Sequence, residues 1–294
     1  MHSDEVPVDA ALVQRLVASQ FPEWASLPVE VVLPWGTDNA LFRLGDELLA
    51  RLPRRELNVA GLEKERHWLP RLAPSLPVAI PEPLAAGMPD GGYPFSWSVY
   101  RWIEGRPGTA GKVRDEAALA RDLAQVIAAL ERIDPTDGPS PGRHNWGRGE
   151  PLEERDHATR EAIATLADRL DAHRATAAWV RALAAPAWRR DPVWLHGDLD
   201  SRNLLVDERG RLCGVIDFGC LGVGDPACDV AAAWKLFSGE SRDIFRATLA
   251  VDDATWERSR GWALSQALMA LAYYTLETNA VLVEEATRWL DETV

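Results

Sequence analysis

The stretch His196-Gly197-Asp198-Leu199-Asp200-Ser201-Arg202-Asn203 decides the fold, and Asp217-Phe218-Gly219 begins fourteen residues after its last member. Short apolar segments surround both parts. We predict three strands and a turn between the last two, namely 193–195, 203–206, 212–216 and the turn 207–210. The polar groups therefore stand at the ends of apolar strands, and such strands hold functional side chains in place.

Three side chains of this stretch are of the types that phosphoryl transfer requires. Asp198 can orient an attacking hydroxyl and accept its proton, whereas Asn203 and Asp217 can hold Mg²⁺ against nucleotide phosphates. Each fragment taken singly is also an ordinary turn, because Asp, Asn and Gly are frequent turn residues. Their order and spacing together favour a kinase-like catalytic centre.

With these motifs the chain resembles the aminoglycoside phosphotransferases, a branch of the protein-kinase-like small-molecule kinases. The resemblance rests on HGDLDSRN (196–203), VIDFG (215–219) and GDPACDVA (224–231), and weaker similarity extends back to about Val29. Protein kinases carry His-Arg-Asp where this chain has His-Gly-Asp, and no Ala-Pro-Glu follows VIDFG. Because the activation loop and peptide platform are missing, a small-molecule acceptor is favoured over a protein.

The resemblance implies an α+β, protein-kinase-like fold of two lobes. Residues 1–103 would form a nucleotide-binding N-lobe of antiparallel sheet plus helix. Residues 104–294 would form a mostly helical C-lobe that holds the catalytic loop and the acceptor site. The residue patterns predict N-lobe strands at 29–33, 40–44 and 47–52 and helices at 59–72, 115–133, within 158–185, at 229–237 and at 259–276.

Arg51 stands in a predicted strand, where kinases carry the lysine that holds the α- and β-phosphates of the nucleotide. The resemblance implies that Arg51 takes this role, as a permanent cation with several donors. Arg54 and Arg55 lie close enough in the sequence to be rivals. The preceding turn, 34–39, would take the place of the nucleotide-covering loop, although its single glycine also fits an ordinary turn.

An acid on the helix predicted over 59–72 would pair with this cation. Glu63 and Glu65 are both candidates, and the family pattern favours Glu65. The resemblance further implies a hinge after an apolar strand. Backbone groups around Arg101 to Ile103 would receive the edge of the adenine ring there.

Two residues near the base have implied structural roles. Asp229 resembles the family's aspartate that braces the catalytic loop, and His196 would anchor the loop by hydrogen bonds. Asp200 and Arg202 flank the base without an assigned role.

Composition restricts the classes of function. The formal net charge of −13 disfavours nucleic-acid binding, because the phosphate backbone would be repelled. The same charge suits a cationic substrate, although solubility alone explains it equally. The sequence shows no apolar run of membrane-spanning length and no secretory leader, and Cys213, Cys220 and Cys228 lack metal-type spacing. We therefore expect a cytoplasmic protein with reduced thiols and no membrane or nucleic-acid partner.

The expected activity is Mg²⁺-dependent phosphoryl transfer from ATP or GTP to a hydroxyl of a small molecule. An aminoglycoside-type antibiotic is the first candidate acceptor, which would make the protein an antibiotic-resistance kinase. Glu277 and Glu284 could pair with its ammonium groups, and Tyr273 and Tyr274 could contact its rings, although helix packing and solvation explain these four equally.

Other functions fit the same motifs. The acceptor could be a macrolide, an amino alcohol or a sugar, because a shared fold does not select among them. A nucleotide-binding module without catalysis is a further alternative, and the replaced lysine is its main support. The sequence leaves open the acceptor and its hydroxyl, the choice between ATP and GTP, and whether the protein is a monomer or a dimer.

Overall fold

The structure is a computed structural model that describes residues 5–33, 39–108 and 113–294. The chain divides into two compact units. The first unit comprises residues 1–74, 79–104 and 214–219, and the second comprises 75–78, 105–213 and 220–294. The turn predicted at 34–39 lies outside the described residues except for Asn39.

A five-stranded antiparallel sheet forms the first unit, in the order β1-β2-β3-β5-β4. Its strands are β1 (Val29–Val31), β2 (Asn39–Leu44), β3 (Leu48–Pro53), β4 (Pro83–Gly87) and β5 (Trp97–Arg101). Alternate residues of β2 (Ala40, Phe42 and Leu44) are buried, as the period of a strand with one core face requires. Central strand β3 carries Arg51 opposite Leu41 of β2 and Ser98 of β5.

Two helices accompany this sheet. α1 (Ala10–Gln20) begins at Asp9, whose side chain caps it by accepting from the Leu12 amide at 2.7 Å. α2 (Val59–Leu72) has the predicted bounds, because three leucines at helical spacing define its buried side. Glu65 is buried on that same side, between leucines of the helix.

The connector between α2 and β5 contains edge strand β4. Pro83 begins edge strand β4, where a proline is tolerated because no ladder donor is needed. Earlier in the connector, the carbonyl of Ala79 accepts from the Val215 amide at 2.9 Å, and Ala79 forms a parallel bridge with Gly214. These contacts place residues 214–219, and hence Asp217, in the first unit.

The second unit contains short strands around the catalytic loop. They are β6 (Arg106–Pro107), β7 (Val193–Leu195), β8 (Leu204–Val206), β9 (Leu212–Val215) and β10 (Gly222–Gly224). The last two residues of β9, Gly214 and Val215, belong to the first unit. They form two small sheets, in the orders β6-β8-β9 and β10-β7. The predicted catalytic loop is the connection from β7 to β8.

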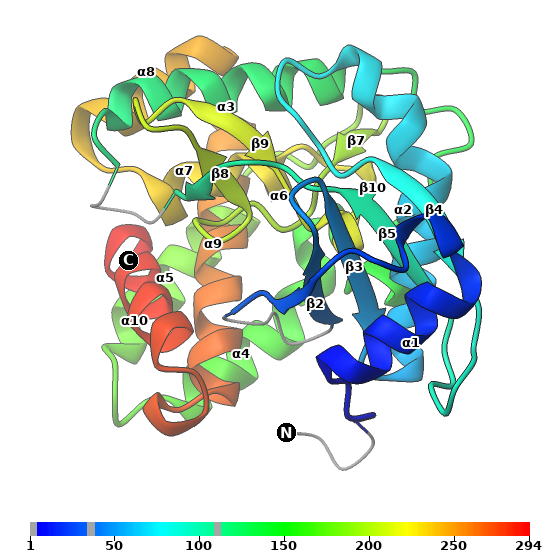
Figure 1. Cartoon of the computed structure of the whole chain (residues 1–294). Helices are drawn as coiled ribbons and strands as arrows, with labels where there is room; N and C mark the ends of the chain where they lie inside the picture. The colour runs from blue at the N-terminus through cyan, green and yellow to red at the C-terminus, as the bar shows by residue number, and fades with distance from the viewer. Residues whose placement is uncertain (1–4, 34–38, 109–112) are drawn as a thin grey trace. The chain divides into compact units, whose positions relative to one another are not determined.

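Helices make up the rest of the second unit. They are α3 (Glu116–Glu131), α4 (Asp156–Thr165), α5 (Ala172–Leu183), α6 (Ala227–Val230), α7 (Ala232–Leu236), α8 (Gly239–Leu249), α9 (Asp253–Tyr273) and α10 (Leu276–Thr293). α9 packs against α4, α5, α6 and α10 and is buried on nearly all sides (Figure 1). A helix with this environment forms the core of a helical unit.

The fold is α+β, as predicted: an antiparallel sheet with helices in the N-terminal part is followed by a mostly helical C-terminal part. Within the described residues, Cys213, Cys220 and Cys228 form no disulfide. None of the helices in the described part of the chain combines the length and apolarity needed to cross a membrane.

Candidate active site

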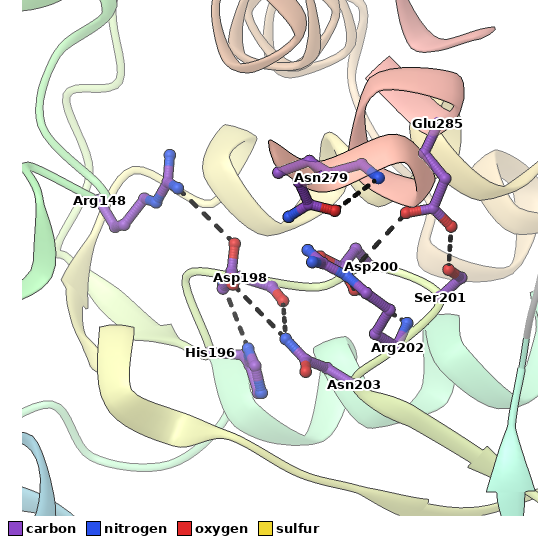
Figure 2. Close-up of polar contacts among 10 residues, drawn as sticks. Arg148, His196, Asp198, Asp200, Ser201, Arg202, Asn203, Asn279 and Glu285 are labelled. Carbon is purple, nitrogen blue, oxygen red and sulfur yellow. Dashed lines mark hydrogen bonds and ion pairs between the residues drawn. The ribbon is translucent and has the colours of Figure 1, made fainter. Parts of the chain in front are cut away.

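The predicted base, Asp198, lies in the β7–β8 loop of the second unit (Figure 2). Its side chain is 33% exposed and can therefore reach a bound molecule. The amide of Asn203 donates from Nδ2 to the backbone carbonyl of Asp198 at 2.8 Å and lies 3.5 Å from Oδ2. The structure thus brings the predicted base and one predicted metal ligand together.

Asp229 on α6 holds the start of this loop. Its buried carboxylate accepts from the backbone amides of His196 at 2.7 Å and Gly197 at 2.8 Å. Burial raises the pKa of Asp229, and the charge of His196 and the two amides oppose this rise only in part. Gly197 has a φ of +84°, and a Cβ there would lie 2.5 Å from the carbonyl oxygen of Cys220. The loop therefore requires glycine between its histidine and its aspartate.

Glu131, at the C-terminal end of α3, is a half-buried acid whose charge opposes folding. Burial and the negative charge of Asp229 raise the pKa of Glu131 to about 7. Between pH 5 and 7 the folded chain therefore keeps a proton that the unfolded chain releases, so the free energy of unfolding falls as pH rises. At neutral pH and above, we expect Glu131→Gln to raise the free energy of unfolding by an amount on the order of 2 kcal/mol, after allowance for partial exposure.

Urea unfolding of both proteins at pH 5 and pH 8 measures this difference, with exposed Glu161→Gln of α4 as the matched control. An unfolding free energy that changes equally with pH in Glu131→Gln and in the wild type would contradict the prediction.

A second network fixes the middle of the loop from α10. Buried Asp200 accepts from the Arg202 amide at 2.9 Å and pairs with the guanidinium of Arg202. The hydroxyl of Ser201 donates to Glu285 of α10, and Nε of Arg202 lies 4.0 Å from the other Glu285 oxygen (Figure 2). Asp200 is thus committed within the protein, which leaves Asp198 as the accessible carboxylate of the loop.

Sequence reasoning missed Glu285 and one further residue, Arg148. Nη2 of Arg148 lies 3.6 Å from Oδ1 of Asp198 (Figure 2). Burial disfavours the charge of Arg148, but the carboxylate of Asp198 together with Cys220 and Cys228 outweighs it, and the pKa of Arg148 is raised. The sequence indicates this arginine only through its two flanking glycines, Gly147 and Gly149, which predict a tight loop and not a partner for Arg148.

The start of α10 is irregular near this loop. Asn279 interrupts the helix with φ −160° and ψ 76°, and its side chain accepts from the Leu282 amide at 3.1 Å, which caps the next turn (Figure 2). Tyr273, Glu277 and Glu284 around this segment are all exposed. The carboxylates of Glu277 and Glu284 form no ion pair with any described residue.

In the first unit, Arg51 joins two of the predicted site residues. Its Nη1 donates to both oxygens of Glu65, at 2.9 and 3.0 Å, and its Nη2 donates to Oδ1 of Asp217 at 2.7 Å. With its amide oxygen turned toward Arg51, Asn39 accepts from Nε and Nη2 at 3.0 Å. Glu65 is fully buried and also accepts from the Tyr100 hydroxyl at 2.7 Å.

The carboxylates of Glu65 and Asp217 raise the pKa of Arg51, and that of Glu65 also raises the pKa of Tyr100. Burial lowers the pKa of Arg51, but Glu65 and Asp217 raise it by more, so Arg51 stays charged. Burial, followed by the charge of Glu65, raises the pKa of Tyr100 well above its ordinary value. The cluster therefore holds one permanent cation against two acids.

Two of the rival residues of the first unit, Glu63 and Arg54, form ion pairs with other residues. Glu63 is exposed, and its nearest ion-pair partner is Arg66 at 4.0 Å. Arg54 pairs with Glu5 at 2.6 Å. Of the two candidate acids on α2, Glu65 is the one that reaches Arg51.

Asp217 has an uncommon backbone conformation. Its φ of +63° is left-handed, which costs energy in a residue with a Cβ and is concentrated at functional sites. The side chain is half-exposed, and one oxygen is engaged by Arg51. The other is available to a ligand.

Two of the three predicted hinge residues donate their backbone amides to other backbone carbonyls. The Arg101 amide donates to the carbonyl of Glu82 at 2.9 Å, and the Trp102 amide donates to that of Glu47 at 2.7 Å. The amide of Ile103 has no hydrogen-bond partner within the described ranges. Of these three donors, Ile103 is therefore the one available to an adenine edge. The Arg101 side chain pairs with Glu82 at an exposed position.

The predicted metal ligands fit Mg²⁺ by their chemistry. Asn203 uses its Nδ2 as a donor, so its amide oxygen remains available, and Asp217 offers a carboxylate oxygen. Such oxygens are the ligands that Mg²⁺ prefers, and the ion usually keeps waters and substrate phosphates in its shell. The described residues contain no group of three or more His, Cys, Asp or Glu side chains that could hold a metal.

Arg51→Ala is expected to weaken nucleotide binding by roughly 10- to 100-fold, because hydrogen bonds to charged groups contribute about 1.5–3 kcal/mol. Calorimetric titration with ATP and GTP measures the effect, and the acceptor KM should change less. Arg54→Ala is the control, since Arg54 pairs with Glu5 instead. Because Arg51→Ala also leaves Glu65 unpaired, Arg51→Lys provides a variant that retains charge. Unchanged nucleotide affinity in both Arg51 variants would transfer the role to Arg54 or Arg55.

Comparison with known proteins identifies the class. Residues 30–262 match the model of the phosphotransferase enzyme family. The chain belongs to this family and, as predicted, is a phosphotransferase.

Solved structures share the fold. The GDP complex of aminoglycoside 2'-phosphotransferase-IIIa is 19% identical, with a TM-score of 0.74 over 97% of this chain and 98% of that one. The GDP and kanamycin complex of APH(2")-IIIa is 20% identical, with a TM-score of 0.73 over 96% and 97%. The apoenzyme of macrolide 2'-phosphotransferase from Brachybacterium faecium is 22% identical, with a TM-score of 0.66 over 97% and 98%.

Proposed function

We propose that this phosphotransferase moves the terminal phosphoryl group of ATP or GTP to a hydroxyl of a small molecule, in a reaction that requires Mg²⁺. The observation that carries the proposal is the accessible carboxylate of Asp198, held by the Asn203 amide in a loop braced by Asp229. This arrangement supplies an acceptor-orienting base beside an oxygen ligand, as phosphoryl transfer requires.

The proposed chemistry assigns a role to each side chain. Asp198 orients the acceptor hydroxyl and takes its proton while the new oxygen–phosphorus bond forms and the bond to the nucleoside diphosphate breaks. Because the transition state is loose, positioning contributes more than proton removal. Arg51, fixed by Glu65, would contact the nucleotide phosphates, and backbone groups of Arg101 to Ile103 would receive the base.

Asn203 and Asp217 are the proposed Mg²⁺ ligands. The ion, when bound, neutralises phosphate charge. We also propose that residues 1–103 bind the nucleotide, that residues 104–294 bind the acceptor, and that the enzyme acts in the cytoplasm as a monomer or dimer.

An aminoglycoside-type acceptor is the first proposal for the substrate. The net charge of −13 and the exposed acids Glu277 and Glu284 suit a polyamine. One structure of similar fold is named as an aminoglycoside phosphotransferase, and another is a complex with kanamycin. The second candidate is a less charged acceptor such as a macrolide. Exposed apolar side chains near the start of α10, at Tyr273, Leu276 and Val281, favour it.

Mass spectrometry of pooled hydroxyl compounds tests the proposal. The full chain is incubated with Mg²⁺, ATP or GTP, and a panel of aminoglycosides, macrolides, amino alcohols and sugars. We expect a product heavier by one phosphoryl group that is absent with Asp198→Ala. Nucleotide binding without any product would favour the binding-module alternative.

A further inference from the structure

The loop that carries Arg148 is fixed along its whole length. Trp146 is left-handed, with a φ of +58°, and glycines with positive φ lie on either side of Arg148. The Arg148 carbonyl accepts from Nδ2 of Asn145 at 3.0 Å, and the Gly149 carbonyl accepts from the Asp225 amide at 2.9 Å. A left-handed bulky residue costs energy, and such strain is concentrated at functional sites.

Gly149 connects this loop to the catalytic loop. A Cβ on Gly149 would lie 2.6 Å from the Leu195 side chain and 3.1 Å from Cα of Gly224, so the backbones touch here. Gly224 is in β10 and Leu195 in β7, and these strands pair with each other. Because β7 leads directly into the catalytic loop, the position of Arg148 relative to Asp198 is set by packed backbone.

Two side chains face the guanidinium of Arg148, the carboxylate of Asp198 and the thiol of Cys220, and Asp198 is the only carboxylate of the two. The Arg148 side chain is 16% exposed, and its only salt bridge within the described residues is to Asp198 at 3.6 Å. Its Nε is buried without a hydrogen-bond partner among those residues. A buried guanidinium normally has several close acceptors. A position that serves packing alone would not require this charge.

We propose that Arg148 is the positioning residue for Asp198 in the phosphoryl-transfer step. This inference rests on the proposed function. The ion pair limits rotation of the Asp198 carboxylate from one side, while Asn203 holds its backbone from the other. The acceptor hydroxyl therefore meets a carboxylate already in its reactive orientation, and misplacement by about 1 Å can cost on the order of 10²-fold in rate.

Steady-state kinetics of Arg148 variants test the proposal with the full chain and the acceptor found in the panel. For Arg148→Ala and Arg148→Gln we expect kcat to fall by about 10²-fold, while KM for nucleotide and acceptor changes by less than about 3-fold. Arg148→Lys should recover at least about 10-fold of the loss. Free guanidinium at millimolar concentration should raise kcat of Arg148→Ala and leave Asp198→Ala inactive.

Arg242→Ala is the matched control, because Arg242 is similarly buried in the second unit and pairs with Glu292. Its kcat should stay near that of the wild type under conditions where it is folded. Three results would overturn the proposal: unchanged kcat in Arg148→Ala, a change confined to KM, or a loss that neither lysine nor guanidinium reduces. A wild-type chain that phosphorylates no acceptor would overturn the proposed function as well, so the two failures are distinguishable.

Discussion

Asp198→Asn is expected to lower the rate of phosphoryl transfer by roughly 10³-fold, because asparagine keeps the shape of the side chain but cannot accept the hydroxyl proton or carry charge. The other acid of the described loop, Asp200, is not expected to take over this role. Asp200 is buried and paired with Arg202, so its carboxylate is not available to an acceptor. The variant should bind ATP or GTP with an affinity within about 3-fold of the wild type, since the predicted role of Asp198 concerns the acceptor.

Single-turnover kinetics and calorimetric titration measure the two quantities separately. Asp168→Asn serves as the control, because Asp168 is an exposed acid of the same unit. Thermal unfolding of both variants identifies any loss due to misfolding. Transfer by Asp198→Asn at near the wild-type rate would show that another residue orients the acceptor.

Local patterns predicted the elements that have one apolar side. β7 and β8 lie where the short apolar runs indicated, and α2 has the predicted bounds, because strands and one-sided helices leave a clear period in the sequence. The fold class was implied by the family resemblance, which rests on the motifs at 196–203, 215–219 and 224–231.

The C-terminal helices were predicted less well. The expected helix at 259–276 is α9, which begins earlier, at Asp253, and ends at Tyr273. Because α9 is buried on nearly all sides, no polar side marks its bounds. The break before α10 had a local signal, since Thr275 caps the new helix and forms a capping box with Thr278.

Site residues within a contiguous motif were predicted, whereas those brought in by tertiary packing were not. Asp198, Asn203 and Asp217 were predicted because their motifs are contiguous. Arg148 and Glu285 reach the loop only through tertiary packing, and their contacts with it join residues 50 and 84 positions apart. One sequence without this packing contains no pattern that could pair them.

Glu65→Ala is expected to lower the free energy of unfolding of the first unit by about 3–5 kcal/mol, because removal of one partner of a buried ion pair leaves the other charge uncompensated. Glu65 is fully buried and Arg51 nearly so, and the Tyr100 hydroxyl would also lose its acceptor. Urea unfolding monitored by tryptophan fluorescence measures the loss. Glu63→Ala on the same helix is the control, and its effect should stay within about 1 kcal/mol, because Glu63 is 61% exposed.

Glu65→Gln separates charge from hydrogen bonding, because the amide oxygen can still accept from Tyr100 or Arg51 while the negative charge is lost. We expect this variant to unfold between the wild type and Glu65→Ala and to bind nucleotide more weakly than the wild type, since Asp217 becomes the main partner of Arg51 and holds it away from phosphates. Equal stability of Glu65→Ala and Glu63→Ala would mean that Arg51 finds full compensation in Asp217, and the cluster would then depend on that single pair.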